Sequence, residues 1–271
     1  MKANPEFYST DLSFWAYVRS ISEKSGYTQN SKIKFLNEND IQTTLRSLAL
    51  APASFEILTQ LESYFKYRAD ILNHYVEPRL MDIERVKVIY EELAEKHKPQ
   101  IPVPMNKQKG EKQAPAYLTG IVNILIEANA DGILWSYDPR ILTTITQNNA
   151  PLRTLARRVD GCFPSCINPI AIWEIKEYYY TTTFGSRVAD GVYETLLDGM
   201  ELSELHHNEG IKVQHLLIVD AHYTWWQKGK SYLCRMIDML HMGYVDEILF
   251  GYETIERLPA IVKNWVQQLK N

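Results

Sequence analysis

The second half of the chain alternates between two kinds of hydrophobic pattern, and this alternation constrains the fold most. Apolar residues at helical spacing indicate helices, and short runs rich in β-branched and aromatic residues indicate strands. Such an order predicts an α/β fold in which helices flank a mixed central sheet. The predicted helices are residues 117–129, 187–207, 230–242 and 253–269, and the predicted strands are residues 158–163, 170–180, 213–221 and 245–250.

Helical spacing also dominates the first hundred residues, where Asp40 suits the N-cap of a second helix. The pattern breaks between residues 98 and 112, where three prolines and Gly110 interrupt it. We therefore expect a helical N-terminal region over residues 1–100 and an α/β domain over residues 101–271. The helices expected in the first part are residues 11–24, 41–50, 54–75 and 82–98.

Composition excludes several classes of protein. The chain has 271 residues, of which 45% are hydrophobic, so it can bury a sizeable core. It has neither an apolar run at its start nor a stretch of about 20 apolar residues, so we expect a cytoplasmic protein without a membrane partner. The net charge of −4 argues against a protein that coats nucleic acid, but it allows positive charge confined to a cleft. No P-loop or G-x-G-x-x-G motif occurs, which argues against a nucleotide cofactor.

The three cysteines, Cys162, Cys166 and Cys234, are too few for a disulfide framework in a chain of this length. The C-x3-C spacing of the first two would need a second pair of ligands to hold zinc. The adjacent His206 and His207 do not easily face one ion. Buried or loop thiols are therefore the favoured interpretation.

The strongest chemical signal is a set of charged residues around the apolar strand predicted over residues 170–180. Glu174 and Lys176 are two residues apart, so their side chains leave the same face of the strand, about 7 Å apart. Charges inside an apolar run are costly unless they are paired or functional. Asp160 precedes a loop with Gly and Pro that could return the chain beside this strand, so the three groups are expected to converge.

Such a convergence suits the hydrolysis of a phosphodiester. Two carboxylates, from Asp160 and Glu174, can hold Mg²⁺, which prefers oxygen ligands and keeps several waters. The ion can polarise the phosphate and activate a water molecule. Lys176 can orient or deprotonate that water, or neutralise the charge that grows on the phosphate.

Asp160 followed by Glu174-x-Lys176 in an apolar strand resembles the motif of the PD-(D/E)XK nuclease superfamily, which includes many type II restriction endonucleases. The predicted helix and strand over residues 187–221 match the core order of that superfamily. The resemblance covers residues 117–251, and it leaves the helical N-terminal region outside.

The resemblance implies a restriction endonuclease-like core with Mg²⁺ as cofactor. It also implies Asp160, Glu174 and Lys176 as catalytic residues, the two acids being metal ligands. Val159 stands where the motif's name has Pro, a position that varies often in the superfamily. Some members add an acidic ligand from the first core helix, for which Glu127 is the candidate here.

The function implied by this resemblance is sequence-specific cleavage of double-stranded DNA by a type II restriction enzyme. A homodimer is expected because one centre cuts one strand and two centres related by a twofold axis cut both. Two alternatives stay open: a repair or recombination nuclease of the same superfamily, and a non-catalytic DNA- or protein-binding module. In the second alternative Glu174 and Lys176 form an ordinary pair on a half-exposed strand. The helical N-terminal region is expected to carry DNA-reading or dimer contacts.

Basic residues in four segments are candidates for DNA contacts, because phosphate contacts supply much of the affinity for DNA. Each segment has a plainer interpretation: a solvated linker, pairing with surface acids, a helix cap formed by Ser186, or an aromatic core edge around residues 223–226. The candidates are Lys107, Lys109, Lys112, Arg157, Arg158, Arg187, Lys228 and Lys230.

Overall fold

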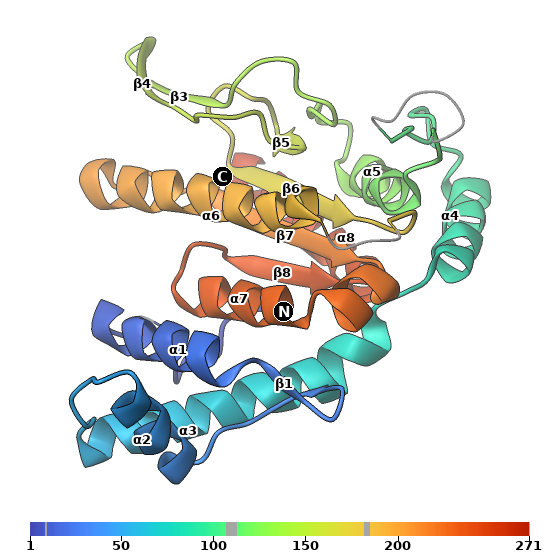
Figure 1. The fold of residues 1–271 in the computed structure, drawn as a ribbon. Helices are drawn as coiled ribbons and strands as arrows, with labels where there is room; N and C mark the ends of the chain where they lie inside the picture. Colours follow the sequence, from blue (N-terminus) through green and yellow to red (C-terminus); the bar gives the residue numbers. More distant parts are fainter. Residues whose placement is uncertain (9, 107–112, 182–184, 271) are drawn as a thin grey trace.

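A four-stranded mixed sheet forms the centre of the protein (Figure 1). The computed structural model describes residues 1–8, 10–106, 113–181 and 185–270. The strand order is β5-β6-β7-β8, where β5 is antiparallel to β6 and the other neighbours are parallel. The predicted α/β class with a mixed central sheet is therefore confirmed. The four strands are β5 (Gly161–Phe163), β6 (Ala171–Glu177), β7 (Gln214–Asp220) and β8 (Glu247–Phe250).

Helices cover both faces of this sheet (Figure 1). On β7, Leu217 and Val219 pack into the apolar cluster that includes one face of α7, whereas Leu216 and Ile218 pack into the cluster of α5 and α8. Because β7 is covered on both sides, its sequence is a continuous apolar run rather than an alternating one. The covering helices are α6 (Ser186–Glu209) and α7 (Lys230–His241) on one face, and α5 (Tyr117–Asn129) and α8 (Glu253–Lys270) on the other.

The N-terminal helices pack below the sheet in the view of Figure 1. The predicted N-cap of the second helix was wrong: Asn37 is the N-cap, and Asp40 completes a capping box from the third helical position. The third helix continues into a π-helical turn (Ile71–Val76) and a 3-10 turn (Glu77–Arg79), which explains why one long helix was predicted. The elements here are α1 (Leu12–Ser25), β1 (Thr28–Gln29), β2 (Lys32–Ile33), α2 (Glu38–Ser47) and α3 (Phe55–Asp70).

A buried polar network joins this N-terminal part to the sheet layer. Asp238 on α7 accepts hydrogen bonds from the Tyr64 hydroxyl at 2.6 Å and from Arg68 Nη1 at 3.0 Å. The side chains of all three residues are buried. Because a buried charge needs its partner, the N-terminal helices are integral to the packing around α7.

Helix α4 (Ile83–His97), which the sequence pattern grouped with the N-terminal region, packs against α5. The rings of Tyr90 and Tyr117 lie 5.4 Å apart, and Gly120 approaches Tyr90 so closely that a Cβ would lie 2.7 Å from its ring. The segment with three prolines lies between these two helices in the sequence, but it does not keep α4 and α5 from packing against each other.

Two features near the candidate site differ from the sequence prediction. A hairpin of β3 (Thr144–Gln147) and β4 (Ala150–Thr154) was missed; its turn places Asn148 and Asn149 at positive φ, which asparagine tolerates. Helix α6 has Gly185 at its N-cap, so the predicted capping role of Ser186 was wrong.

A second π-helical turn (Tyr223–Lys228) precedes α7. Across the described ranges, no helix is both long and apolar enough to span a membrane.

Candidate functional site

The structure brings together the three residues on which the predicted site rests. Glu174 and Lys176 leave the face of β6 that α6 covers, while Trp173 packs on the opposite face. Asp160 immediately precedes β5, and its Oδ2 accepts a hydrogen bond from the backbone N–H of Ile175 at 2.8 Å. The backbone N–H of Asp160 lies 3.2 Å from Glu174 Oε1. The predicted convergence of these groups is present.

Gly161 allows this close approach. A Cβ at this position would lie 2.1 Å from the ring of Trp173, its partner across the antiparallel pair. No side chain fits in that space without moving the indole. Gly161 therefore lets β5 pass directly over the ring of Trp173, and this holds the preceding residue, Asp160, beside β6.

Glu174 and Lys176 form a buried ion pair rather than a pair on a half-exposed strand. Their relative exposures are 0% and 5%, and Lys176 Nζ lies 2.6 Å from Glu174 Oε2. The interpretation as a pair on a half-exposed strand is therefore wrong. Two ions buried this deeply need further partners to offset the loss of their hydration.

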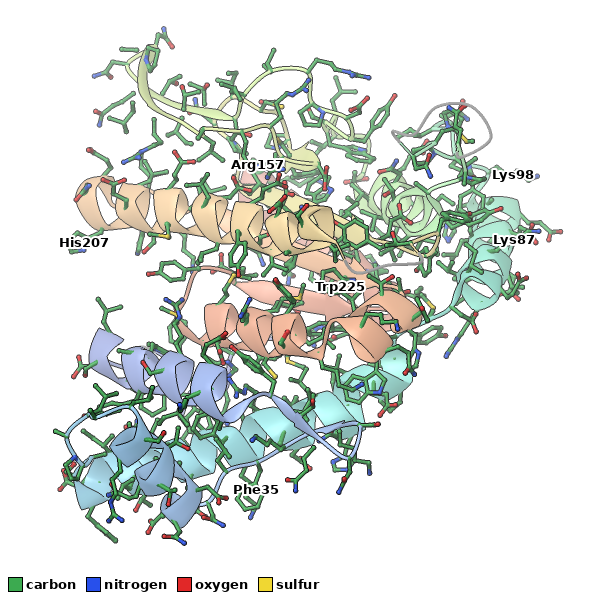
Figure 2. The ribbon with its side chains drawn as sticks, viewed as in Figure 1. Phe35, Lys87, Lys98, Arg157, His207 and Trp225 are labelled. Atoms are coloured by element: carbon green, nitrogen blue, oxygen red, sulfur yellow. The ribbon has the colours of Figure 1, made fainter. Side chains whose placement is uncertain are left out.

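Arg157 supplies the second cation of the site. Its Nη1 lies 2.8 Å from Glu174 Oε1 and 2.6 Å from Asp198 Oδ2, so one nitrogen bridges two carboxylates. Its Nη2 lies 3.3 Å from Glu194 Oε2, which is also 3.7 Å from Lys176 Nζ. Figure 2 shows Arg157 between the segment that leads to β5 and helix α6. The guanidinium predicted to grip phosphate is thus committed to three carboxylates.

These residues form a charged cluster of four carboxylates and two cations, whose charges shift the pKa values of its members. The carboxylates are Asp160, Glu174, Glu194 and Asp198, and the cations are Arg157 and Lys176. Burial disfavours the ionised form of Glu174, but Lys176 and Arg157 outweigh it and lower its pKa. Burial likewise opposes the charge on Lys176, yet Glu174 and Asp160 raise its pKa. Burial and the charge on Glu174 raise the pKa of Asp198 to about 7. The ammonium of Lys176 is therefore held in its charged form at neutral pH.

Two members of the cluster were missed by sequence reasoning. Glu194 and Asp198 are four residues apart on α6, so they lie on the same side of the helix. Asp198 is fully buried, and within the described ranges its Oδ1 has no hydrogen-bond partner. The i, i+4 spacing of these two acids on a predicted helix could have indicated a shared site. Such pairs are common on the solvent-exposed faces of helices, so the spacing by itself did not distinguish them.

The cluster reaches the surface on one side. The side chain of Glu194 is 46% exposed and that of Arg157 is 23% exposed, while Glu174 and Asp198 are closed off behind them. A ligand would therefore approach Glu174 past the Arg157 guanidinium.

The third acidic ligand expected from the sequence, Glu127, lies elsewhere. It stands near the C-terminal end of α5, and its Oε1 accepts a hydrogen bond from the backbone N–H of Gln100 at 2.9 Å. The N-terminal end of α5 is the part that contacts β6: Glu177 accepts hydrogen bonds from the backbone N–H groups of Leu118 and Thr119. Glu127 is two helical turns beyond this contact, so the structure does not bring it to the cluster.

The remaining basic candidates are dispersed. Arg158 is exposed, next to the buried cluster, and Arg187 lies in the first turn of α6. Lys228 and Lys230 are placed beside the rings of Tyr223 and Trp226, at 5.6 and 4.6 Å from the ring centroids. Lys107, Lys109 and Lys112 fall outside the residues that the structure describes. Trp225 and Trp226 are buried, in agreement with the core-edge interpretation.

The three cysteines are buried free thiols, as the sequence favoured, and Cys162 Sγ lies 3.4 Å from Cys166 Sγ. No group of three or more His, Cys, Asp or Glu side chains within the described ranges is arranged to hold a metal ion. The donors that face Arg157 are carboxylate oxygens, the kind that Mg²⁺ prefers, and Mg²⁺ is often held by only one or two protein carboxylates.

Comparison with protein families gives two matches that divide the chain. Residues 81–265 match a domain of unknown function, DUF7687, and residues 1–75 match a second one, DUF7690. The chain belongs to the DUF7687 family. The DUF7687 match begins just before α4 and includes the whole sheet and the charged cluster. Comparisons with curated proteins and with solved structures gave no match.

Proposed function

We propose that this member of the DUF7687 family is a Mg²⁺-dependent endonuclease with a restriction endonuclease-like core of the PD-(D/E)XK kind. The observation that carries the proposal is that Glu174 and Lys176 pair on one face of β6 while Asp160 contacts Glu174 and Ile175 of the same strand. The order of α5, β5, β6, α6 and β7, with β6 and β7 parallel, supports it as well.

The charge and the donor atoms of the cluster support the proposal of a divalent metal ion. The acids of the cluster are Asp160, Glu174, Glu194 and Asp198, and with Arg157 and Lys176 they leave an excess of two formal negative charges. In the described part of the chain the fully buried Asp198 Oδ1 has no hydrogen-bond partner, so this oxygen is available to a metal ion. Asp160 and Glu174 are the proposed ligands. The ion, when bound, would polarise the phosphate and stabilise the charge that develops on it.

Lys176 acts in this proposal as a fixed cation. Because its pKa is raised, it keeps its proton at neutral pH, so it neutralises charge on the phosphate rather than deprotonating water. Water attacks phosphorus and releases a proton to solvent, the bond from phosphorus to the leaving oxygen breaks, and that oxygen takes a proton from solvent. Arg157, at the exposed edge of the cluster, is the first cation that an approaching phosphate would meet.

The proposed substrate is double-stranded DNA, cut at a specific sequence by a homodimer whose two centres each cut one strand. Exposed Arg158 and the basic candidates Arg187, Lys228 and Lys230 are the proposed backbone contacts, together with the lysines between residues 107 and 112. The N-terminal helices are proposed to read DNA or to form the dimer contact.

Digestion of plasmid DNA tests the proposal. Cleavage is expected with Mg²⁺ and should stop in EDTA, while DNA binding partly survives. Lys176→Met should lower the cleavage rate on the order of 10² or more, since single electrostatic groups contribute this much. Lys212→Met is the matched control, because Lys212 is an exposed lysine paired with Asp246 and should cut at the wild-type rate.

The ends of the cut DNA separate the remaining possibilities. A fixed cut position supports a restriction enzyme, and cuts that follow DNA structure rather than sequence support a repair or recombination nuclease. Cleavage that persists in EDTA or in the Lys176→Met variant refutes the assigned centre. Absence of cleavage together with metal-independent binding supports a binding module.

A further inference from the structure

The position of Arg157 Nη1 points to a site for a divalent cation between β6 and α6. This nitrogen lies 2.8 Å from Glu174 Oε1 and 2.6 Å from Asp198 Oδ2. One positively charged group at this position therefore faces an oxygen from each of the two carboxylates. Both side chains are fully buried, so their places are set by packing and not by solvent.

A second observation shows that Arg157 does not satisfy this site. Asp198 Oδ1 has no hydrogen-bond partner among the residues that the structure describes, although the side chain is fully buried. A buried carboxylate oxygen without a partner costs free energy, and natural structures retain such atoms where water, an ion or a ligand completes them. The other oxygen of the same carboxylate, Oδ2, faces Arg157.

The surroundings limit which ligand fits. Lys176 Nζ already lies 2.6 Å from Glu174 Oε2, and Glu194 stands at the exposed side of Arg157. Four carboxylates around two cations leave an excess of negative charge, so an anion is disfavoured unless a cation accompanies it. The donors are oxygens only, which favours Mg²⁺ or Mn²⁺ over zinc.

We propose that Asp198 is a metal ligand together with Glu174, and that Arg157 Nη1 holds the place of the cation until a phosphate draws the guanidinium outward. The inference deepens the proposed nuclease function and rests on the same centre. It assigns a ligand on α6 in place of the one expected from Glu127 on α5. In this arrangement Arg157 and the metal ion compete for the same two oxygens.

Binding of Mn²⁺ in the absence of nucleic acid tests the inference, with free Mn²⁺ followed by electron paramagnetic resonance. Asp198→Asn should weaken Mn²⁺ binding by roughly tenfold or more, because affinity depends on the charge of the ligands. Glu204→Gln is the matched control: Glu204 lies on the same helix, pairs with Arg153 and is exposed, so its variant should bind as wild type.

Arg157→Gln gives the sharper result. Removal of the competing guanidinium should tighten Mn²⁺ binding, whereas an ion cluster that serves only packing would lose stability without binding metal. The shift in melting temperature that Mn²⁺ produces provides a second readout, and it should be larger in Arg157→Gln than in wild type. Asp198→Asn keeps the shape of the side chain, so it remains informative if Arg157→Gln fails to fold.

The outcomes separate this inference from the proposed function. Wild-type Mn²⁺ affinity in Asp198→Asn overturns the ligand assignment, even if the protein cuts DNA. Mn²⁺ binding that needs Glu174 and Asp198, in a protein that cuts no DNA, upholds the metal site and refutes the nuclease proposal. Weaker binding in a folded Arg157→Gln variant would overturn the competition between guanidinium and cation.

Discussion

The buried pair of Glu174 and Lys176 makes a prediction about stability that can be worked from its geometry. From the strand pattern alone, removal of the Lys176 charge from an apolar run would be expected to leave folding intact. The structure reverses this expectation, because Lys176 is the 2.6 Å partner of a fully buried carboxylate. Loss of one member of such a pair costs about 3–5 kcal/mol, since the other charge stays buried and uncompensated.

The expected cost for Lys176→Met lies near the lower end, at about 3 kcal/mol, because Glu174 keeps its contact with Arg157 at 2.8 Å. Methionine preserves the aliphatic stem, so the change removes charge with little loss of packing. Glu174→Gln should cost a similar amount, because Lys176 then loses its charged partner at 2.6 Å and keeps the longer, 3.7 Å contact with Glu194.

A double-mutant cycle isolates the interaction. The variant that carries both Lys176→Met and Glu174→Gln should be more stable than the sum of the two single losses predicts, by about 2 kcal/mol. Urea denaturation measures each free energy of unfolding, with an unchanged m value required for the comparison. If the single losses add to within about 0.5 kcal/mol, the two side chains are not coupled and the electrostatic argument for this site is refuted.

Three further changes test other parts of the structure. Gly161→Ala should destabilise the protein by several kcal/mol and abolish the proposed DNA cleavage, since its Cβ would lie 2.1 Å from the Trp173 ring; a melting temperature within a few degrees of wild type would contradict the described packing. Arg68→Ala should cost about 3 kcal/mol in urea denaturation, because Asp238 stays buried without its cation; an unchanged midpoint would count against the network. Burial raises the pKa of Asp220 to about 7, so the folded state holds that proton more tightly than the unfolded state does. The stability this contributes is fully present below the ordinary aspartate pKa of about 4, and it is lost as pH rises from there to about 7. Wild type should therefore lose stability relative to Asp220→Asn between about pH 4 and 7, and an unchanged difference in melting temperature across that range would refute the shift.

The order of elements could be predicted from the sequence because hydrophobic period is a local property. The helix Tyr117–Asn129 was predicted with its bounds, and the apolar runs around Glu174 and in β7 were recognised as strands. Strand alternation alone placed Glu174 and Lys176 on one face. The hairpin β3–β4 was missed because its strands are short and half-exposed, so they carry little periodic signal.

Tertiary structure alone decided which charges surround this pair. Arg157, Glu194 and Asp198 reach Glu174 from a loop and from α6, and nothing local in their sequence distinguishes them from residues on a solvated surface. The packing of α4 on α5 was decided in the same way, because a contact between two helix faces depends on which surfaces the whole chain brings together. The sequence by itself determined that an acid and a lysine share a strand face; folding determined that the face is buried, since only a covering helix can remove water from both.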